Sequence, residues 1–546
     1  MKKSGLRSLL PQSSDYRQLR ETWRRDVLAG LTVGIVALPL ALAFGVTSGV
    51  GAEAGLVTAI VAGLVAAIFG GSHVQVSGPT GAMVVILAPI AAIHGVNAVI
   101  TVSLMAGLLV LIAGACRLGR LVQFIPWPVV EGFTLGIALI IFAQQIPAAV
   151  GAAGESTNAI IAAGQAVHAA DWPQALVPLA AVLAVAALMV SVARFLPAVP
   201  GSFVAIVVLT IVVAAADMPL TLIGELPASL PAPTLPNLAP ETISALAGPA
   251  VAVAALAAIE SLLSARVAAS MSDTGPFDAD RELVGQGLAS IAAGFFAGMP
   301  ATGAIARTAV NVRAGGRTRL SAIVHSVALF AVVAFAASVV SRIPLVALSG
   351  VLMVTAVRMV STRTLRMVFH STRSSAATFV VTALVTLAFD LVIAIVIGLA
   401  AAAFFSLRAL SRASGVHREE IAGPVTAGDE RIAIFRIDGA LFFGAVDRII
   451  ERVASQRGVD VVILRLSQLQ LVDATGALEL STLVRALEQR DITVLIKGIR
   501  PEHLTVMRRM EVLSSLRHHN HLFDGLDDAV EHARSHIRRL DQTTSV

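Results

Sequence analysis

The chain has 546 residues, of which 56% are hydrophobic and only 14% are charged, whereas soluble domains usually carry about 25% charged residues. This composition excludes a soluble enzyme and predicts a protein that crosses a membrane several times. Lys and Arg number 40 against 35 Asp and Glu, and they are scattered over short loops, which disfavours nucleic-acid binding. The single cysteine, Cys116, excludes an intramolecular disulfide and a paired-cysteine zinc site.

A membrane domain is predicted over residues 26–410, after a basic N-terminal segment over 1–25. Each crossing needs about 20 apolar residues, and some of the fourteen apolar segments are too short to cross alone. The segments lie at 27–48, 54–70, 80–93, 97–116, 124–147, 173–193, 199–216, 246–267, 283–298, 304–312, 321–340, 345–359, 374–389 and 391–408. Basic residues, Arg281 and Arg319 among them, mostly follow even-numbered segments, which predicts that both termini are cytoplasmic.

Two similar stretches precede short apolar segments in the two halves of this domain. The first break, Ser77–Ala82, reads SGPTGA, and the second break, Met299–Ala304, reads MPATGA. Their threonines are 222 residues apart, an offset that carries the third segment onto the tenth. Because seven is odd, the second copy enters the membrane from the opposite side, so the sequence predicts a seven-plus-seven inverted repeat. In transporters of this kind, paired interrupted segments indicate the substrate site near the midplane.

The residue types in the breaks predict an anion site. Pro79 and Pro300 disfavour helix in the preceding residue, and Thr80 and Thr302 are candidate N-caps of the helices that follow. Two helix N-termini would then face each other, each with unpaired N–H groups and a partial positive charge. Arg307, in the first turn of the tenth segment, adds a full positive charge.

Glu260, well inside the eighth segment, is the most informative acid. A carboxyl group within a membrane is functional by default, and two roles remain open for it. It could carry a proton, or it could be a fixed partner of Arg307. Ser261 and Ser264 supply hydroxyl groups nearby as supporting polar residues, although serine in membrane helices also serves helix packing.

No cofactor or metal is predicted. His94, His168 and His325 are isolated and have no partner at metal-ligand spacing. The sequence shows no Gly-rich nucleotide loop and no catalytic Ser/His/Asp arrangement, so an enzyme is not predicted.

Charge returns after residue 410, and a soluble α/β domain is predicted over 430–535, with a linker over 411–429 and a tail over 536–546. Short β-rich runs alternate with helical patterns, which predicts a small sheet with helices packed on it. The expected strands are 432–437, 461–466 and 493–496, and the expected helices are 446–456, 474–489 and one beginning near Pro501.

Nearly the whole chain resembles the sulfate permease (SulP) family of anion transporters. The resemblance rests on the stretch from Asp26 to Phe44, on Gly78–Ala82, on Thr302–Asn311 and on a C-terminal domain similar to STAS domains. It implies core and gate domains, movement of an elevator type, and dimers. It also implies an anion held between the third and tenth segments, beside an aromatic residue that is here Phe44. It also implies that Glu260 is the coupling position; with Ser264 nearby, this chain is more similar to proton-coupled members than to sodium-coupled ones.

The loop Leu471–Gly476 resembles the STAS motif, whose phosphorylated serine in stand-alone relatives is replaced here by Ala474. Thr475 is expected to cap the next helix. The predicted substrate-binding residues of the membrane domain are Phe44, Pro79, Thr80, Gly81, Ala82, Gly303, Ala304, Ile305, Ala306 and Arg307.

The leading hypothesis is therefore secondary active transport of a small anion, such as sulfate, bicarbonate or a small dicarboxylate, coupled to protons. The expected protein is a homodimer in the cell inner membrane whose STAS-like domain can have a cytoplasmic partner; no nucleic acid is expected. A nucleobase permease of the same fold, an anion channel, and a membrane scaffold or sensor acting through the soluble domain remain alternatives.

Overall fold

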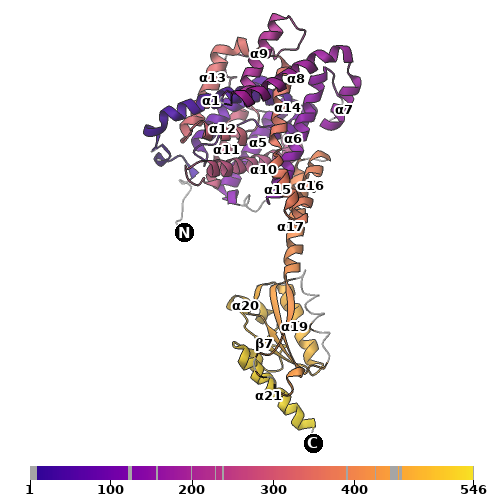
Figure 1. The fold of residues 1–546 in the computed structure, drawn as a ribbon. Coiled ribbons are helices and arrows are strands. Elements are labelled where there is room, and N and C mark those ends of the chain that lie inside the picture. The colour runs from indigo at the N-terminus through magenta and orange to yellow at the C-terminus, as the bar shows by residue number, and fades with distance from the viewer. Residues whose placement is uncertain are drawn as a thin grey trace. The chain divides into compact units, whose positions relative to one another are not determined.

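A computed structural model describes residues 9–544, apart from residues 17, 121–125, 155, 157, 198, 228, 237–238, 389–390, 423, 425, 443–452 and 454–457. The chain divides into two compact units, Met1–Ala400 and Ala401–Val546, called here the membrane unit and the soluble unit. Figure 1 shows that the first consists almost wholly of helices and that the second contains the sheet.

All fourteen predicted apolar segments are helical, and the structure confirms an α-helical polytopic membrane fold. The second segment is a composite in which a π-helical turn separates two α-helices. The elements are α1 (Leu19–Thr47), α2 (Ala52–Val57) with η3 (Thr58–Ala62) and α3 (Gly63–Phe69), α4 (Gly81–His94), α5 (Val96–Ala115), α6 (Trp127–Val150), α8 (Trp172–Phe195), α9 (Gly201–Ala215), α10 (Pro240–Met271), α11 (Ala279–Phe295), α12 (Ile305–Arg313), α13 (Arg319–Val340), α14 (Leu345–Met359), α16 (Arg373–Ala388) and α17 (Leu391–Ala413).

Two further helices, α7 (Ala159–Ala169) and α15 (Thr362–His370), were not predicted. α7 lies between the fifth and sixth predicted segments, and α15 carries Arg363 and Arg366 beside apolar Met367 and Phe369. Among the described residues, eight helices are long and apolar enough to cross a membrane. The helices after the two breaks are shorter, with 14 residues in α4 and nine in α12.

Contacts between the helices form two groups. In one, α5 packs on α10 and α11, and α1 packs on α13 and α12; in the other, α6 packs on α14 and α16, and α8 packs on α9 and α14. The expected core and gate would match these two groups, although α1 also packs on α14 of the other group. Small residues allow the close approach: a Cβ atom at Gly287 of α11 would press on the backbone of Leu111 and Gly107 in α5, as is typical of membrane helix pairs.

Arg281 and Arg319, predicted to be basic residues of cytoplasmic loops, are buried in the first turns of α11 and α13. Arg281 is 6% exposed and pairs with Asp15 at 2.6 Å, while Arg319 is 1% exposed and donates to the Ala67 carbonyl at 3.0 Å. Arg281 also donates to the Phe69 carbonyl at 3.3 Å. The last carbonyls of α3 have no partner within the helix, so these arginines complete a helix end and say little about loop orientation.

The soluble unit contains a six-stranded mixed sheet. Strands β4 (Ile432–Leu441), β5 (Val461–Arg465), β7 (Thr493–Lys497) and β8 (Leu522–Phe523) are parallel neighbours, and β6 (Leu469–Val472) pairs parallel with the end of β4. Because successive strand residues face opposite sides, the sheet has two apolar faces. One packs on α19 (Ala474–Glu488) and α20 (Pro501–Arg509), the other on α21 (Leu526–Thr544).

The predicted strands and the helices at 474–489 and Pro501 are thus present, whereas the expected helix 446–456 lies almost entirely outside the described residues. The predicted linker contains a strand, β3 (Gly415–Glu419), which pairs antiparallel with β4. The predicted tail is also structured, because α21 continues to Thr544 and places Ile537, 2% exposed, in the apolar core beneath the sheet. Composition alone did not predict β3 or the end of α21, because both contain charged residues beside the apolar ones.

Candidate functional site

The two breaks lie side by side as a two-stranded antiparallel sheet. Strand β1 (Ser77–Gly78) pairs with β2 (Thr302–Gly303), with Ser77 opposite Gly303 and Gly78 opposite Thr302. A further backbone bond joins the Ala304 N–H to the Val76 carbonyl at 2.9 Å. α4 follows β1 and α12 follows β2, so the antiparallel pairing brings the N-termini of these two short helices together at the break.

Thr80 and Thr302, predicted as N-caps, do not cap the helices that follow them. Thr80 is at the N-cap position of α4 but its hydroxyl does not bond the helix, and Thr302 is not a cap at all, because α12 begins at Ile305 with Ala304 as its N-cap. The second helix starts later than the repeat implies because the Gly303 and Ala304 N–H groups are held by Ser261 and Val76. No described side chain caps either helix, so first-turn N–H groups remain for an anion.

Arg307 bridges the two halves. Its side chain is 1% exposed, and Nη2 donates to the Pro79 carbonyl oxygen of the first break at 2.5 Å. Its Nη1 is buried with no hydrogen-bond partner among the described residues. The guanidinium lies against the backbone of Gly78, where a Cβ atom would approach Nη1 to 2.6 Å. A buried cation with free donor capacity therefore lies beside both helix ends, which is favourable for an anionic ligand.

Glu260, on α10, contacts both breaks through one carboxylate oxygen. Its Oε2 accepts from the Thr80 hydroxyl at 2.8 Å and from the Thr302 hydroxyl at 2.9 Å, and the two hydroxyl oxygens are 3.2 Å apart. Glu260 as a whole residue is half-buried. No ion-pair contact joins Glu260 to Arg307 in the described part of the chain, so the direct partners of the carboxylate are neutral hydroxyls. Arg307 still lies close enough to act on it electrostatically.

The two supporting serines on α10 contact the second break. Ser261 accepts from the Gly303 N–H at 3.0 Å, and Ser264 lies 3.3 Å from the hydroxyl of Thr308. Both side chains are fully buried. They position the backbone and α12, and neither extends the site towards open space.

The remaining predicted residues divide between buried and exposed positions. Phe44, 7% exposed, lies over the start of α4, where a Cβ atom on Gly81 would be 3.3 Å from its ring. Pro79, Ala82, Gly303 and Ala304 are likewise buried, whereas Ile305 and Ala306 in the first turn of α12 are exposed. The structure thus brings together the predicted residues from α1, both breaks, α10 and α12.

The profile of the sulfate permease family matches residues 23–413, and that of the STAS domain matches residues 423–529. The chain belongs to the sulfate permease family. This family member is therefore a multi-pass membrane protein of a sulfate and bicarbonate transporter family, with a C-terminal STAS domain.

Named relatives align over almost the full chain. YvdB of Bacillus subtilis, which bears the name of a sulfate transporter, is 33% identical, and the alignment covers 93% of this chain and 97% of YvdB. The bicarbonate transporter BicA of Picosynechococcus sp. is 28% identical, with 90% of each chain covered. Both relatives are named as transporters.

Solved structures share the architecture. The transmembrane domain of a cyanobacterial BicA matches with a TM-score of 0.63 and 30% identity, covering 71% of this chain and 98% of that one. Murine Slc26a9, an anion transporter solved in the inward-facing state, matches with a TM-score of 0.82 over 98% of this chain and 96% of that one. At 16% identity the latter likeness shows the fold alone.

Two polar residues of α12 were missed by the sequence reasoning. Thr308 accepts from the Val76 N–H at 3.0 Å, and Asn311 donates to the Val74 carbonyl at 2.8 Å. Both are fully buried and hold the segment that leads into the first break. The signal was present, since Thr308 and Asn311 are three residues apart and so lie on one helix face.

In the STAS domain, the loop Leu471–Gly476 ends a strand and begins α19 as predicted, but the capping residue differs. Asp473 is the N-cap, and its carboxylate accepts from the Gly476 N–H at 2.7 Å. Thr475 is instead an exposed residue of the first turn, beside the exposed Ala474. A carboxylate at this position also interacts favourably with the helix dipole, so the expected threonine cap is unnecessary.

Proposed function

We propose that this protein is a secondary active transporter that carries a small anion across the cell inner membrane and couples the movement to protons. The single observation that supports the anion site is the pairing of β1 with β2, which brings two uncapped helix N-termini together beside the buried Arg307. Helix ends and a desolvated guanidinium are both favourable for a negative charge. The anion-binding residues would be those of the two breaks, the first turn of α12 and Phe44.

Coupling would follow from the position of Glu260. Its carboxylate and a bound anion would share the threonines of the breaks, and like charges at such short range repel each other. Protonation of Glu260 would remove that repulsion and the cost of moving a bare carboxylate through the bilayer. Proton and anion would therefore bind together. Because the hydroxyls of Thr80 and Thr302 would contact both Glu260 and the anion, protonation of Glu260 and binding of the anion would each favour the other.

Movement would be of the elevator type, in which the group of helices that carries the breaks moves against the α6, α8 and α14 group. The expected unit is a symmetric homodimer, with both termini in the cytoplasm. The names of the relatives, sulfate transporter and bicarbonate transporter, make these two anions the first substrates to test, followed by small dicarboxylates.

Uptake by purified protein in liposomes tests this proposal. Labelled sulfate, bicarbonate, fumarate and succinate are offered with and without an inward proton gradient, and protein-free liposomes are the control. Accumulation of one anion that rises with the proton gradient is the expected result. Uptake of labelled uracil would favour a nucleobase permease, currents too large for a carrier cycle would favour a channel, and absence of flux for every anion would favour a scaffold.

A further inference from the structure

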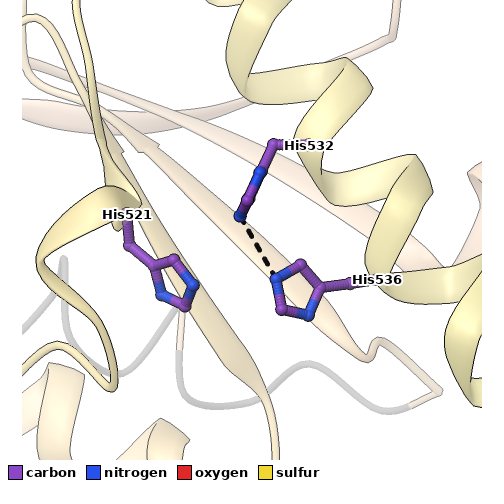
Figure 2. A group of neighbouring side chains, drawn as sticks. All are labelled: His521, His532 and His536. Carbon is purple, nitrogen blue, oxygen red and sulfur yellow. Dashed lines mark hydrogen bonds between the residues drawn. The ribbon is translucent and has the colours of Figure 1, made fainter.

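Three histidines of the soluble unit point towards one another (Figure 2). His532 and His536 are four residues apart on α21 and so lie on the same helix face. His521 comes from the end of η6 (His519–His521), directly before β8. The three side chains therefore join the last helix to the last strand of the sheet. This group, called the histidine triad, is distinct from the anion site.

The separations of the ring nitrogens suit a metal ion. The Nε2 atoms of His532 and His536 are 3.3 Å apart, and one ligand atom from each of the three rings lies within 4.8 Å of the others. Two nitrogens that bind one tetrahedral zinc at about 2.0–2.1 Å are separated by about 3.3–3.4 Å. The pair on α21 already has this spacing, and a rotation of the His521 ring would bring in the third ligand.

A hydrogen bond between imidazoles does not account for the whole triad. It would satisfy the Nε2 atoms of His532 and His536, but the Nδ1 of His521 is buried without a hydrogen-bond partner in the described residues, and this side chain is 1% exposed. An orphaned buried ring nitrogen costs free energy unless something fills the position. A cation shared by the three rings would satisfy it.

The donor set selects the class of metal. Imidazole nitrogen suits zinc, copper, nickel and iron, whereas magnesium and calcium require oxygen ligands. The triad contains three imidazoles and no carboxylate. Arg517 and Arg539 lie close enough to His536 to act on it electrostatically, and their positive charge opposes a cation held by charge attraction alone. A metal ion here would therefore depend on coordination by the imidazole nitrogens.

We propose that His521, His532 and His536 bind a divalent transition-metal ion, of which zinc is the first to test, with water in the fourth position. The ion fastens α21 to the strand β8 in addition to their apolar contacts. The expectation from sequence that no metal is bound rests on the isolation of His94, His168 and His325. It does not consider His532 and His536, and His521 could be added only by the fold.

Titration of the full-length protein with zinc tests the site. Protein purified in detergent through a tag without histidine is stripped with chelator, and ZnCl₂ binding is followed by calorimetry. One zinc per chain is expected. His532→Ala and His536→Ala should each weaken binding by about tenfold or more, because even outer-shell changes commonly cost 10–100-fold. His519→Ala, which changes an exposed neighbour in η6, is the matched control and should bind as wild type does.

Two further readouts separate binding from folding. Co²⁺ in place of Zn²⁺ should give the visible absorption of a tetrahedral site in wild type and in His519→Ala but not in the double variant His532→Ala/His536→Ala. Zinc should also slow amide hydrogen exchange in α21 and β8 of the wild type alone. Because both altered histidines are only half-buried, these variants should fold. Zinc binding by the double variant with wild-type affinity and stoichiometry, or no stoichiometric zinc binding by the wild type, would overturn the proposal.

Discussion

The first and second breaks share a backbone plan, yet their helices carry opposite kinds of side chain. The repeat offset of 222 residues places Val85 of α4 where α12 has Arg307, and Ile86 where it has Thr308. Every residue of α4 before its C-terminal histidine is glycine, proline or apolar, whereas the buried residues of α12 are Arg307, Thr308 and Asn311.

The repeated backbone and the side chains of α12 make different contributions to the site. The paired strands place two helix ends together, which symmetry alone can do. The polar face of α12 then performs two tasks that have no counterpart in α4: Arg307 supplies the charge, and Thr308 with Asn311 holds the backbone before the first break. One cation in a symmetric frame favours a single anion site over two.

Removal of that cation should have the largest effect. We expect Arg307→Ala to weaken anion binding by about 2–5 kcal/mol, because truncating a desolvated charged group leaves its partners unpaired. Val85→Ala, at the matching position of the first repeat, is the control and should change stability more than affinity. Binding of the transported anion to purified, monodisperse protein is the measurement. Wild-type affinity in a folded Arg307→Ala protein would remove Arg307 from the site.

Neutralisation of Glu260 should abolish coupling while sparing binding. Glu260→Gln imitates the protonated acid, so the loaded core can still cross the bilayer but can no longer carry a proton. A charge at the bilayer centre costs at least about 2.5–3.5 kcal/mol on insertion scales, and the amide avoids this cost. Uptake driven by an inward proton gradient should be lost, and anion-for-anion exchange should persist.

Glu260→Asp tests whether coupling needs only an ionisable carboxyl group or also the length of the glutamate side chain. The shorter carboxylate stays ionisable but cannot contact both Thr80 and Thr302 as well as glutamate does, so we expect weaker coupling and not its complete loss. If liposomes with Glu260→Gln still accumulate the anion as steeply with the proton gradient as wild type does, Glu260 is a structural partner of the threonines and another group carries the proton.

Loss of one hydroxyl on α12 should destabilise the first break moderately. Thr308→Val keeps the shape but leaves the Val76 N–H without its acceptor, at a cost of about 1–3 kcal/mol. Thr210→Val on α9 is a matched control, since the Thr210 hydroxyl is buried without a described partner and its removal should not destabilise. Thermal unfolding in detergent compares the two. A melting temperature equal to wild type for Thr308→Val would show that this bond contributes little.

Features that depend on local sequence were predictable, and features that depend on pairing were not. The fourteen segments and the two breaks follow from long apolar runs and a repeated motif, so they could be placed to within a few residues. The late start of α12 could not be foreseen, because it results from bonds between its first residues and Ser261 on α10 and Val76 in the other repeat.

Buried charge was the other source of error. Arg281 and Arg319 look like loop residues in the sequence, but each is held by Asp15 or by carbonyl groups of α3, which lie more than 200 residues away. Positive charge in a membrane protein is therefore a guide to orientation only where the side chain is free to reach water. Strand β3 shows the same limitation, since only its pairing with β4 distinguishes it from a linker.

The smallest expected effect comes from removal of the chain after Arg412, which contains the STAS domain. If the contrast between α4 and α12 creates the site, a chain that ends after Arg412 retains every residue of that contrast and should bind the anion within about threefold of the full-length protein, a change of less than 1 kcal/mol. The truncated protein should also remain a dimer in lipid, because the apolar surface of the membrane unit is intact and symmetric pairing is the commonest assembly.

Binding assays and mass measurement in nanodiscs give the two readouts separately. A strictly monomeric truncated chain beside a dimeric full-length protein would assign assembly to the STAS domain. A truncated chain that stays dimeric but binds the anion far more weakly would show instead that the soluble unit acts on the breaks, and the difference between the two repeat halves would then be insufficient to explain the site.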